Sequence, residues 1–329
     1  MTNLAKTISI IIVNWNGRHF IQKCLNAVRQ QTRKDYLSIL VDNGSDDGSL
    51  ELVQENYPEV KIIALSNNLG FATANNVAIK SVNTEYVALL NPDAVPHPEW
   101  LEQLIKALQQ NPEAGFAASK MLFYHKPKVI DRAGDLYTDA AVALLRGRGK
   151  PSQTFNNQEW IFGACAGAAL YRKRMLQDIG LFDEDFFLLY EDVDLSFRAQ
   201  LRGYKCLYVP EAIVYHMTSS SVGNDSPVSV YYSHRNLEWV YLQNMPASLI
   251  KRTLVYHVIY DIAAFFFFAA KGRVAEFVKS KWHAMKGLNR ALKKRRRVQK
   301  TKKVRDEYIW ALFEKELFLP RLSRRIRKS

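Results

Sequence analysis

The chain has 329 residues, of which 48% are hydrophobic and 24% are charged, a composition that is typical of a globular protein and excludes a disordered chain. Its formal net charge is +14, but residues 271–329 carry 21 Lys and Arg against 5 Asp and Glu, a balance of +16. Residues 1–270 carry 25 against 27, a balance of −2. A nearly neutral body followed by a strongly basic tail indicates two parts with different roles.

Cysteine usage and the first apolar run both bear on the compartment. The three cysteines, Cys24, Cys165 and Cys206, are scattered and show no CxxC spacing. This pattern argues against a disulfide framework or a zinc site and fits a reducing compartment. The first apolar run, residues 8–13, is too short for the core of a signal peptide. We therefore expect the chain to remain in the cytoplasm.

Apolar runs alternate with amphipathic segments along the first 120 residues. The predicted strands are residues 8–13, 37–41, 60–65, 86–90 and 114–119. Continuous apolar strands that alternate with helices predict an α/β fold with a mostly parallel central sheet flanked by helices. In such a sheet a ligand binds at the carboxyl ends of the strands. Polar clusters after the first four predicted strands therefore indicate a site.

These polar clusters offer amides and carboxylates. They are residues 14–17 (NWNG), 42–49 (DNGSDDGS), 66–70 (SNNLG) and 91–93 (NPD). No GxGxxG follows the first strand and the chain has no GxxxxGK[ST], which disfavours a dinucleotide oxidoreductase and a P-loop kinase. Asp42 could accept the imide N–H of a uracil or thymine, and Asn68 and Asn91 suit ribose or phosphate. The alternative for residues 42–49 is a loop with a helix cap.

The cluster Asn91-Pro92-Asp93 has the character of a metal–diphosphate site. One hard carboxylate, together with phosphate oxygens and waters, is how Mg²⁺ or Mn²⁺ is usually held. Taken alone, the same tripeptide more often forms a turn.

Residues 180–198, GLFDEDFFLLYEDVDLSFR, combine six acidic residues with a run of large apolar ones. Glu191 and Asp192 open a predicted helix directly after Phe-Phe-Leu-Leu-Tyr. Carboxylates at a helix start beside an aromatic wall suit a general base, because partial desolvation raises their pKa while the helix dipole restrains the rise. The alternative is a capped amphipathic helix with Val193 and Phe197 facing the core.

The basic C-terminal region differs in character from the rest of the chain. Residues 253–270 are mostly apolar but contain His257 and Asp261, so they lie at the lower limit for a membrane span. An amphipathic basic segment and the run Lys293-Lys294-Arg295-Arg296-Arg297 follow, a pattern typical of an interfacial helix at anionic lipid. We expect this region to dock on a membrane without crossing it, with His257 and Asp261 reaching water. The alternatives are a solvated basic tail and nucleic-acid binding, for which no motif is present.

The order of the motifs VNWNG, VDNGSDDGS, NNLGFATANN, LLNPDA, GLFDEDFFLLYEDVDLSFR and VYHMTSSS resembles that of the inverting family 2 glycosyltransferases with the GT-A fold. Within this family the chain looks most like the rhamnosyltransferase-type branch that builds bacterial surface polysaccharides. The resemblance covers residues 7–245. It departs at the metal motif, where the family's DxD reads Asn91-Pro92-Asp93 and the first carboxylate is absent.

The resemblance implies roles for individual residues. The residues that would bind the nucleotide-sugar are Asn14, Trp15, Asp42, Asn68, Gly70, Asn91 and Asp93. Asp93 and His216 would hold Mg²⁺ or Mn²⁺, with the histidine binding through a neutral imidazole. Asp192 would act as the general base, with Glu191 as its rival and Asp194 as a brace for the loop. Residues 163–168 and 227–246 would lie near the sugar and the acceptor. The alternatives are tight helix or strand packing for the first segment and amphipathic helix packing for the second.

The sequence thus predicts an inverting glycosyltransferase, with a GT-A domain at residues 1–250 and a membrane-associating helical region at residues 251–329. We expect dTDP-rhamnose or a UDP-sugar as donor, a lipid-linked or polysaccharide acceptor, and a position on the inner face of the cell membrane. One alternative is a sugar-1-phosphate nucleotidyltransferase, which would need a glycine-rich basic loop after the first strand. Another is a non-catalytic nucleotide-sugar-binding scaffold, which the presence of Glu191, Asp192 and His216 disfavours.

Overall fold

The computed structural model describes residues 6–218 and 225–315. Residues 219–221 of the VYHMTSSS motif and residues 316–329 of the basic tail lie outside the described residues. The chain forms two compact units: unit 1 is Met1–Asp135 with Leu145–Ser221, and unit 2 is Leu136–Leu144 with Val222–Ser329. Unit 2 therefore includes residues 222–250, which the sequence analysis assigned to the first domain.

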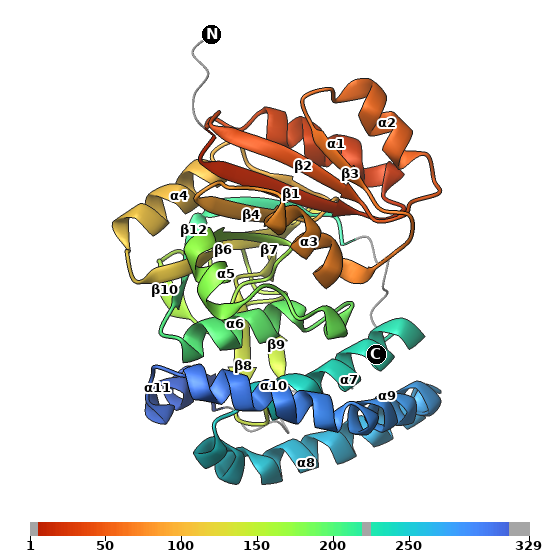
Figure 1. Ribbon diagram of the computed structural model, residues 1–329, viewed down its shortest axis with the longest axis vertical. Helices are drawn as coiled ribbons and strands as arrows, with labels where there is room; N and C mark the ends of the chain where they lie inside the picture. Colours follow the sequence, from red (N-terminus) through yellow and green to blue (C-terminus); the bar gives the residue numbers. More distant parts are fainter. Residues whose placement is uncertain (1–5, 219–224, 316–329) are drawn as a thin grey trace. The chain divides into compact units, whose positions relative to one another are not determined.

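Unit 1 is built on a central sheet with the strand order β10-β12-β6-β11-β4-β1-β2-β3, to which β5 and β7 add at β12 and β6 (Figure 1). Its strands are β1 (Ile8–Asn14), β2 (Tyr36–Asp42), β3 (Lys61–Ala64), β4 (Tyr86–Leu90), β5 (Ala94–Pro96), β6 (Ala114–Phe123), β7 (Lys126–Arg132), β10 (Glu159–Ile161), β11 (Ala168–Arg172) and β12 (Lys205–His216). Every strand predicted from the sequence is present, within a few residues of its expected ends.

The two halves of this sheet differ in how their strands pair. Strands β4, β1, β2 and β3 run parallel, as predicted. In the other half β11 runs antiparallel to both β4 and β6, while β12 is parallel to β6. Strand β7 runs antiparallel to β6 because the two strands form a hairpin. Several later connections also lack the crossover helix that a parallel pair of strands needs. The sheet is therefore parallel in its first half and mixed in its second.

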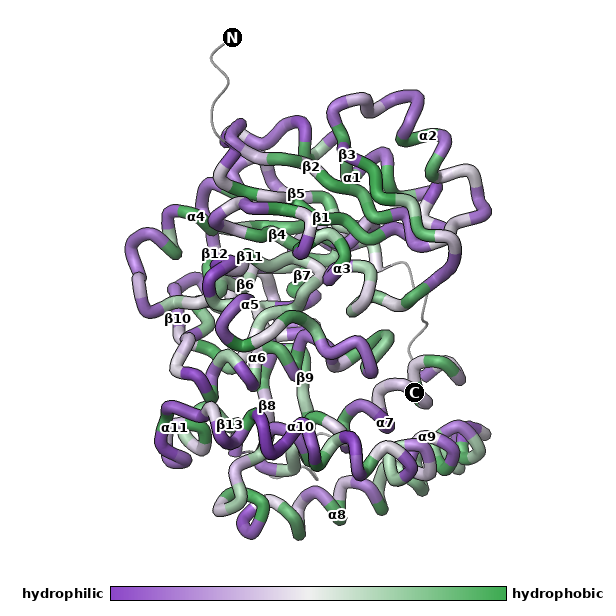
Figure 2. The backbone as a smooth tube through the Cα atoms, in the orientation of Figure 1, coloured by the Kyte–Doolittle hydropathy of each residue, from purple (hydrophilic) through white to green (hydrophobic). Residues whose placement is uncertain are grey.

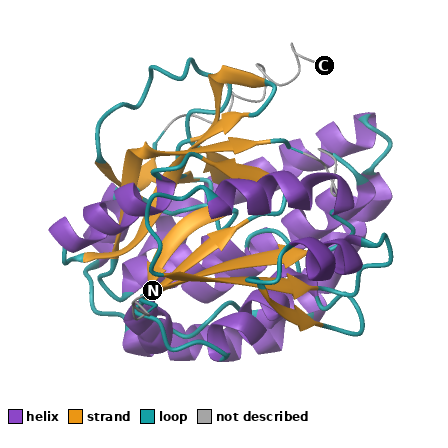
Figure 3. Cartoon of the chain, turned by 90° about the horizontal axis from the view of Figure 1, so that it is seen from above, coloured by secondary structure: helices purple, strands orange, loops and turns teal. Residues whose placement is uncertain are grey.

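Helices cover both faces of the sheet, as Figure 3 shows. One face carries α1 (Arg18–Arg29), α2 (Ser49–Asn56) and α4 (Trp100–Gln110), and the other carries α3 (Gly70–Lys80), α5 (Lys173–Ile179) and α6 (Glu191–Leu201). The residues of β1 alternate between two cores: Ile10 and Ile12 pack with the first set of helices, and Ile11 packs with the second. A strand buried on both faces must be apolar at every position, which is the pattern that the sequence shows.

Unit 2 is mainly helical. It contains α7 (Pro227–Asn244), α8 (Ala247–Ala270), α9 (Val274–Lys286), α10 (Leu288–Thr301) and α11 (Asp306–Ala311), with a small sheet of β8 (Asp135–Thr138), β9 (Ala143–Leu145) and β13 (Phe313–Glu314). The Ser226 side chain caps α7 by accepting a hydrogen bond from the Ser229 N–H. Val230, Phe268 and Phe277 join α7, α8 and α9 in an apolar core.

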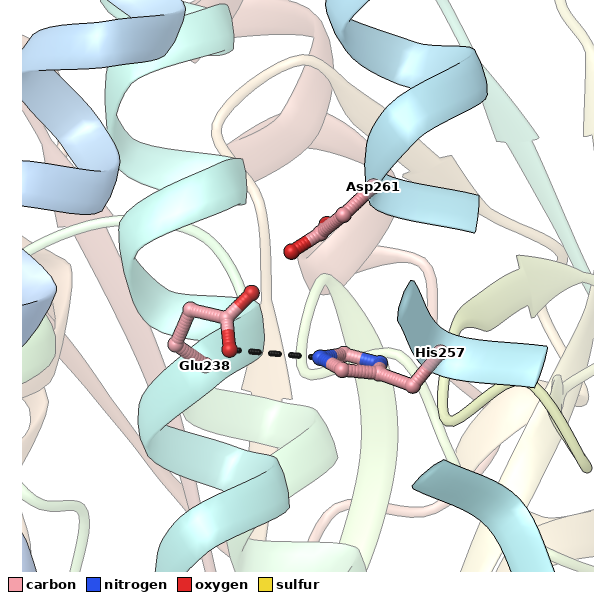
Figure 4. A group of neighbouring side chains, drawn as sticks. All are labelled: Glu238, His257 and Asp261. Carbon is pink, nitrogen blue, oxygen red and sulfur yellow. Dashed lines mark hydrogen bonds and ion pairs between the residues drawn. The ribbon is translucent and has the colours of Figure 1, made fainter. Parts of the chain in front are cut away.

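An ionic cluster of Glu238, His257, Asp261 and Lys281 also joins these three helices. Figure 4 shows Glu238 of α7 facing His257 of α8, with Asp261 directed towards the same space. His257 Nε2 lies 3.2 Å from Glu238 Oε2, and Lys281 Nζ lies 2.6 Å from Asp261 Oδ1 and also contacts Glu238. Glu238, His257 and Asp261 are spaced closely enough to hold a metal ion, but the Lys281 ammonium already supplies a positive charge between the two carboxylates.

The expectation that His257 and Asp261 reach water is therefore wrong for His257. Its side chain is buried, and Nδ1 lies 3.0 Å from the Ala140 carbonyl oxygen. Asp261 is partly buried and pairs with Lys281. The sequence pattern of α8 could not reveal this, because the partner charges come from α7 and α9.

Candidate active site

Side-chain hydrogen bonds connect the end of β1 to the end of β2. Asn14 lies opposite Asp42 in the parallel register, and it is fully buried. Its Nδ2 donates to Asp42 Oδ1 (3.3 Å) and to Ser49 Oγ (2.8 Å), while Asp42 Oδ2 accepts from the Ser45 N–H (3.1 Å). Asn14 thus positions Asp42, whereas the neighbouring Trp15 side chain is 45% exposed and is available to a ligand.

Asn68 and Gly70 shape the loop that leads into α3. Asn68 Oδ1 accepts hydrogen bonds from the Gly70 N–H and from Asn43 Nδ2, both at 2.9 Å. Gly70 has φ +83°, and a Cβ there would lie 2.5 Å from the Phe187 ring. The Phe71 N–H donates to the Phe187 carbonyl oxygen at 2.7 Å. A side chain at residue 70 would therefore separate this loop from the acidic segment before α6.

The end of β4 contacts residues 163–168. The Asn91 N–H donates to the Gly167 carbonyl oxygen at 2.9 Å, and a Cβ on Gly167 would lie 2.7 Å from Asn91 Nδ2. The glycine therefore allows the Asn91 amide to lie directly against the backbone of this loop. Two residues later Asp93 is buried, with Oδ1 3.3 Å from His216 Nε2.

His216, at the end of β12, is held between two carboxylates. Its Nδ1 lies 2.8 Å from Asp131 Oδ2, and Asp131 is also paired with Arg148 at 2.5 Å. Burial lowers the pKa of His216, but the hydrogen bonds to Asp131 and Asp93 outweigh it and raise that pKa to about 9. Burial alone would raise the pKa of Asp131, but its contacts with His216 and Arg148 bring it below its usual value.

This arrangement fits a divalent metal ion. With Nδ1 engaged by Asp131, the Nε2 atom of His216 faces Asp93, so one imidazole nitrogen and one carboxylate oxygen point into the same space. A carboxylate that receives the other ring N–H is the usual support for a metal-binding histidine. Asp131 was not identified from the sequence, because nothing in the strand β7 distinguishes it from an ordinary exposed acid.

Glu191 and Asp192 share the first turn of α6 but occupy different environments. Glu191 is buried, and its Oε2 has no hydrogen-bond partner among the described residues. Burial, and then the charge of Asp192, raise the pKa of Glu191 well above its usual value. The Asp192 side chain is 14% exposed, and its Oδ2 accepts from the Ala166 N–H at 3.3 Å. Asp192 is therefore the more accessible carboxylate of the two.

The backbone before α6 is held in an unusual conformation. Phe187, Leu189 and Tyr190 have φ values of +62°, +65° and +69°, which side-chain-bearing residues rarely adopt. Such conformations persist where the surrounding structure imposes them, and they concentrate at functional sites. Asp194 braces this region, as expected: it pairs with Arg198 at 2.8 Å. Arg198 in turn donates to the carbonyl oxygens of residues 179, 180 and 181.

Arg132 and Asp135 are two further residues that the sequence analysis missed. Arg132 Nη1 lies 3.4 Å from Asp135 Oδ1 and 3.9 Å from Asp192 Oδ2. Burial raises the pKa of Asp135 to about 7, an increase that Arg132 opposes and Asp192 adds to. Asp135 reaches the site because its N–H pairs with the Gly163 carbonyl oxygen at 2.9 Å. A motif search could not find either residue, since the contacts join distant parts of the chain.

Comparisons with known proteins agree with this architecture. A family model described as Glycosyl transferase family 2 matches residues 9–180. The N-acetylglucosaminyl-diphospho-decaprenol L-rhamnosyltransferase of Mycobacterium tuberculosis is 26% identical over 272 residues, which cover 73% of this chain and 85% of that protein. A poly-beta-1,6-N-acetyl-D-glucosamine synthase of Staphylococcus epidermidis is 23% identical, over 66% of this chain and about half (51%) of that protein.

Solved structures share the fold. The mannosyltransferase PcManGT from Pyrobaculum calidifontis, in complex with GDP-Man and Mn²⁺, aligns with a TM-score of 0.55 at 15% identity, over 94% of this chain and 86% of its own. Residues 1–349 of S. aureus TarS, in complex with UDP-GlcNAc, align with a TM-score of 0.57 at 17% identity, over 89% and 90%. The family match covers slightly more than half of the chain, and it confirms the resemblance seen in the motifs. The chain is therefore a member of glycosyl transferase family 2, a glycosyltransferase with the GT-A fold.

Proposed function

We propose that this enzyme transfers a sugar, with inversion at the anomeric carbon, from a nucleotide-sugar to a lipid-linked or polysaccharide acceptor, with Asp192 as the general base. The observation that carries the proposal is the contrast at the start of α6, where Asp192 is partly exposed, whereas Glu191 is buried and its Oε2 has no hydrogen-bond partner among the described residues. A base must reach the proton that it abstracts, so accessibility favours Asp192.

The donor that we propose first is dTDP-rhamnose, and a UDP-sugar is the next candidate. Support for rhamnose comes from the mycobacterial relative, whose name is that of an L-rhamnosyltransferase acting on a diphospho-decaprenol-linked sugar. Support for a nucleoside diphosphate sugar in general comes from the structural relatives, which hold UDP-GlcNAc and GDP-Man. Asp42 and Trp15 would contact the base, Asn14, Asn68 and Gly70 would shape the pocket, and Asn91 and Asp93 would face the diphosphate.

In the proposed reaction Asp192 accepts the proton of an acceptor hydroxyl as its oxygen bonds to the anomeric carbon. The bond between that carbon and the diphosphate oxygen breaks in the same step, and the nucleoside diphosphate leaves with the electron pair. A single displacement inverts the configuration and needs no covalent enzyme intermediate. Arg132, 3.9 Å from Asp192, and the hydrogen bond from the Ala166 N–H would fix the direction of the Asp192 carboxylate.

Asp93 and His216 are the residues that would hold a divalent ion, Mg²⁺ or Mn²⁺, and Asp131 would orient His216. The ion would supply positive charge beside the departing diphosphate when it is bound. The mannosyltransferase relative contains Mn²⁺, which supports this choice of metal. We also propose that the enzyme works at the inner face of the cell membrane, with catalysis within residues 1–250 and membrane association within residues 251–329.

A panel of nucleotide-sugars tests this proposal. The purified full chain is incubated with dTDP-rhamnose, UDP-sugars and GDP-mannose, with Mn²⁺ or with EDTA, and the release of nucleoside diphosphate is followed by mass spectrometry. We expect turnover of one donor class, dependent on the metal and abolished in Asp192→Asn. Turnover that is equal in EDTA would remove the metal from the proposal, and an active Asp192→Asn enzyme would remove the base.

A further inference from the structure

We infer that the outer side of the α8–α9 hairpin is a docking surface for an anionic lipid bilayer, and that α8 lies along this bilayer without crossing it. The inference deepens the proposed function, since a lipid-linked acceptor would be met at such a surface. The observations that support it do not involve the proposed catalytic residues. By length and composition alone, α8 could also cross a membrane. The contacts on its two sides distinguish a helix that lies along the membrane from one that spans it.

The inner side of α8 is fixed to its neighbours in unit 2. Thr253 Oγ1 lies 3.0 Å from Tyr241 Oη of α7, and His257 pairs with Glu238 of the same helix. Asp261 then pairs with Lys281 of α9. These contacts recur every four residues, so they follow one side of the helix over two turns. A membrane-spanning α8 would have to give up these polar contacts or carry the partner helices with it.

The opposite side of α8 is apolar and uncovered. Val255, Ile259, Ile262 and Phe266 are exposed, and they recur at helical spacing about 200° around the helix from the inner contacts. Phe266 is the most exposed of the four, at 66%. Figure 2 shows long pale and green stretches along α8, whereas α10 is mostly purple. An apolar stripe of this length is not the surface of an ordinary solvated helix.

Helix α9 extends the apolar surface on the same side. Its exposed apolar residues are Val274, Val278, Trp282 and Met285. They lie beside Lys281, which pairs with Asp261 of α8, and away from the buried side of α9 that carries Phe277 and Ala284. Phe265 bridges the two helices, because its exposed ring lies 6.2 Å from the Phe277 ring. The stripes of α8 and α9 therefore form one surface.

Most of the exposed large apolar residues that the structure describes lie on these helices and on α10. Among the described residues, fourteen of the eighteen large hydrophobic side chains that are exposed belong to α8, α9 and α10. The other four are Trp15, Leu69, Trp160 and Val228, and they belong to other elements. A gathering of this kind marks a surface that is covered when the protein functions.

The charge around the surface identifies the occupant as anionic lipid. Residues 247–301 contain 14 Lys and Arg against 2 Asp and Glu, a balance of +12. The exposed basic residues are Lys251, Arg252, Lys271, Lys279, Lys286, Arg290, Lys293, Arg296, Arg297 and Lys300. The two acids, Asp261 and Glu276, are partly buried. An apolar stripe with a basic border is the pattern of a helix that lies in the interface of an anionic membrane.

Co-sedimentation with vesicles tests the surface. The full chain should bind vesicles that contain phosphatidylglycerol, bind pure phosphatidylcholine weakly, and be released by high salt or alkaline carbonate. The variant Ile259→Glu/Phe266→Glu should bind at least tenfold more weakly, because two apolar side chains can no longer enter the acyl boundary. The matched control Trp160→Glu/Gln109→Glu adds the same charge to exposed residues outside the surface, and it should bind within about twofold of the wild type.

Circular dichroism and donor hydrolysis in solution accompany both variants. We expect an unchanged fold and unchanged hydrolysis, because the substituted residues are exposed and lie outside the proposed catalytic site. If the wild type binds vesicles but hydrolyses no donor, the proposed function fails and the docking surface stands. If it hydrolyses a donor but the two double variants bind vesicles equally, the docking surface fails alone.

Spin labels measure the orientation of α8. Single cysteines replace Val255, Ile259, Ile262 and Phe266 in turn, in a chain that also carries Cys165→Ala, since Cys24 and Cys206 are buried. Labels on a helix that lies along the membrane should all sit at the same shallow depth. In a spanning helix the first and last labels would differ in depth by about 16 Å. Such a gradient would overturn the inference, as would binding to DNA without vesicle binding, or self-association that covers the surface without lipid.

Discussion

The two clusters of charged residues in this protein are built in opposite ways. In unit 1, Glu191 and Asp135 each keep a buried carboxylate oxygen with no hydrogen-bond partner among the described residues, and Asp135 and Asp192 share the Arg132 guanidinium, at 3.4 and 3.9 Å. In unit 2, Glu238 and Asp261 are both contacted by Lys281, and Glu238 also pairs with His257. The first cluster sets three carboxyl groups beside one guanidinium, whereas the second pairs two carboxylates with a lysine and a histidine.

The physical consequence differs accordingly. Buried polar groups without partners cost stability, so a fold retains them where they have another use. A neutralised cluster mainly aligns the helices that contribute to it, and removing one member leaves the others uncompensated. We therefore expect substitutions in the first cluster to alter activity more than stability, and substitutions in the second to alter stability more than activity.

The largest expected effect is that of Asp192→Asn on catalysis. The amide keeps the shape but cannot take the acceptor's proton, so the transfer rate should fall by about 10²–10⁴-fold. Binding of the nucleoside diphosphate, measured by calorimetry, should be nearly unchanged. Glu191→Gln is the control, because its side chain is buried beside the same site. A dead Glu191→Gln enzyme with an active Asp192→Asn enzyme would exchange the two roles.

Next in size is the effect of Lys281→Met on the stability of unit 2. The substitution leaves Glu238 and Asp261 without their shared cation, which should cost about 2–3 kcal/mol at these partly buried positions. Chemical denaturation followed by circular dichroism measures it. Lys279→Met removes an exposed lysine from the same helix and should cost less than about 0.5 kcal/mol. Equal costs for the two variants would contradict a structural role for the cluster.

A smaller effect should follow from Asp131→Asn, which tests whether His216 is positioned for a metal. Without the carboxylate at Nδ1, the affinity for Mn²⁺ in the presence of the nucleoside diphosphate should fall by about 10–100-fold. Calorimetric titration with Mn²⁺ measures this affinity and does not depend on enzyme activity. Glu59→Gln changes an acid far along the chain from β4 and β12 and should leave Mn²⁺ binding unaltered. An unchanged affinity in Asp131→Asn would separate Asp131 from the metal site.

The smallest expected effect is a pH dependence of the stability of unit 2. Burial raises the pKa of Glu238, but His257 and Lys281 lower it to about 2. The contribution of Glu238 to the free energy of unfolding is therefore present above pH 4.5 and is lost as the pH falls towards 2. Burial lowers the pKa of His257, but Glu238 outweighs burial and raises this pKa above 6.5. The contribution of His257 to the free energy of unfolding is therefore complete below pH 6.5 and is lost as the pH rises.

The burial of Asp261 raises its pKa, which also favours the folded state at lower pH. Thermal unfolding should therefore occur at the highest temperature between about pH 4.5 and 6.5. The variant His257→Gln should flatten the alkaline side of this profile. A profile of the same shape in the variant would show that the histidine does not titrate on unfolding.

Much of the parallel half of unit 1 is readable from the sequence. Ile8 to Asn14 form a strand buried on both faces, and such a strand must be apolar throughout, so its pattern is local. Where each strand ends, the carboxyl-end rule brings Asp42 and Asp93 towards one edge of the sheet. The reversed direction of β11 could not be predicted, because it depends on which distant strand it pairs with.

The remaining features depend on contacts between distant residues. Glu191 and Asp192 are adjacent and chemically alike, so no pattern separates them, and only packing makes one buried and the other accessible. Asp131 lies 85 residues before His216, and the two meet because β7 and β12 both pair with β6. The composition of α8 predicts a membrane-active helix, but its orientation follows from charges on α7 and α9. Amino-acid order specifies local periodicity, whereas burial and charge pairing arise only when separate segments pack together.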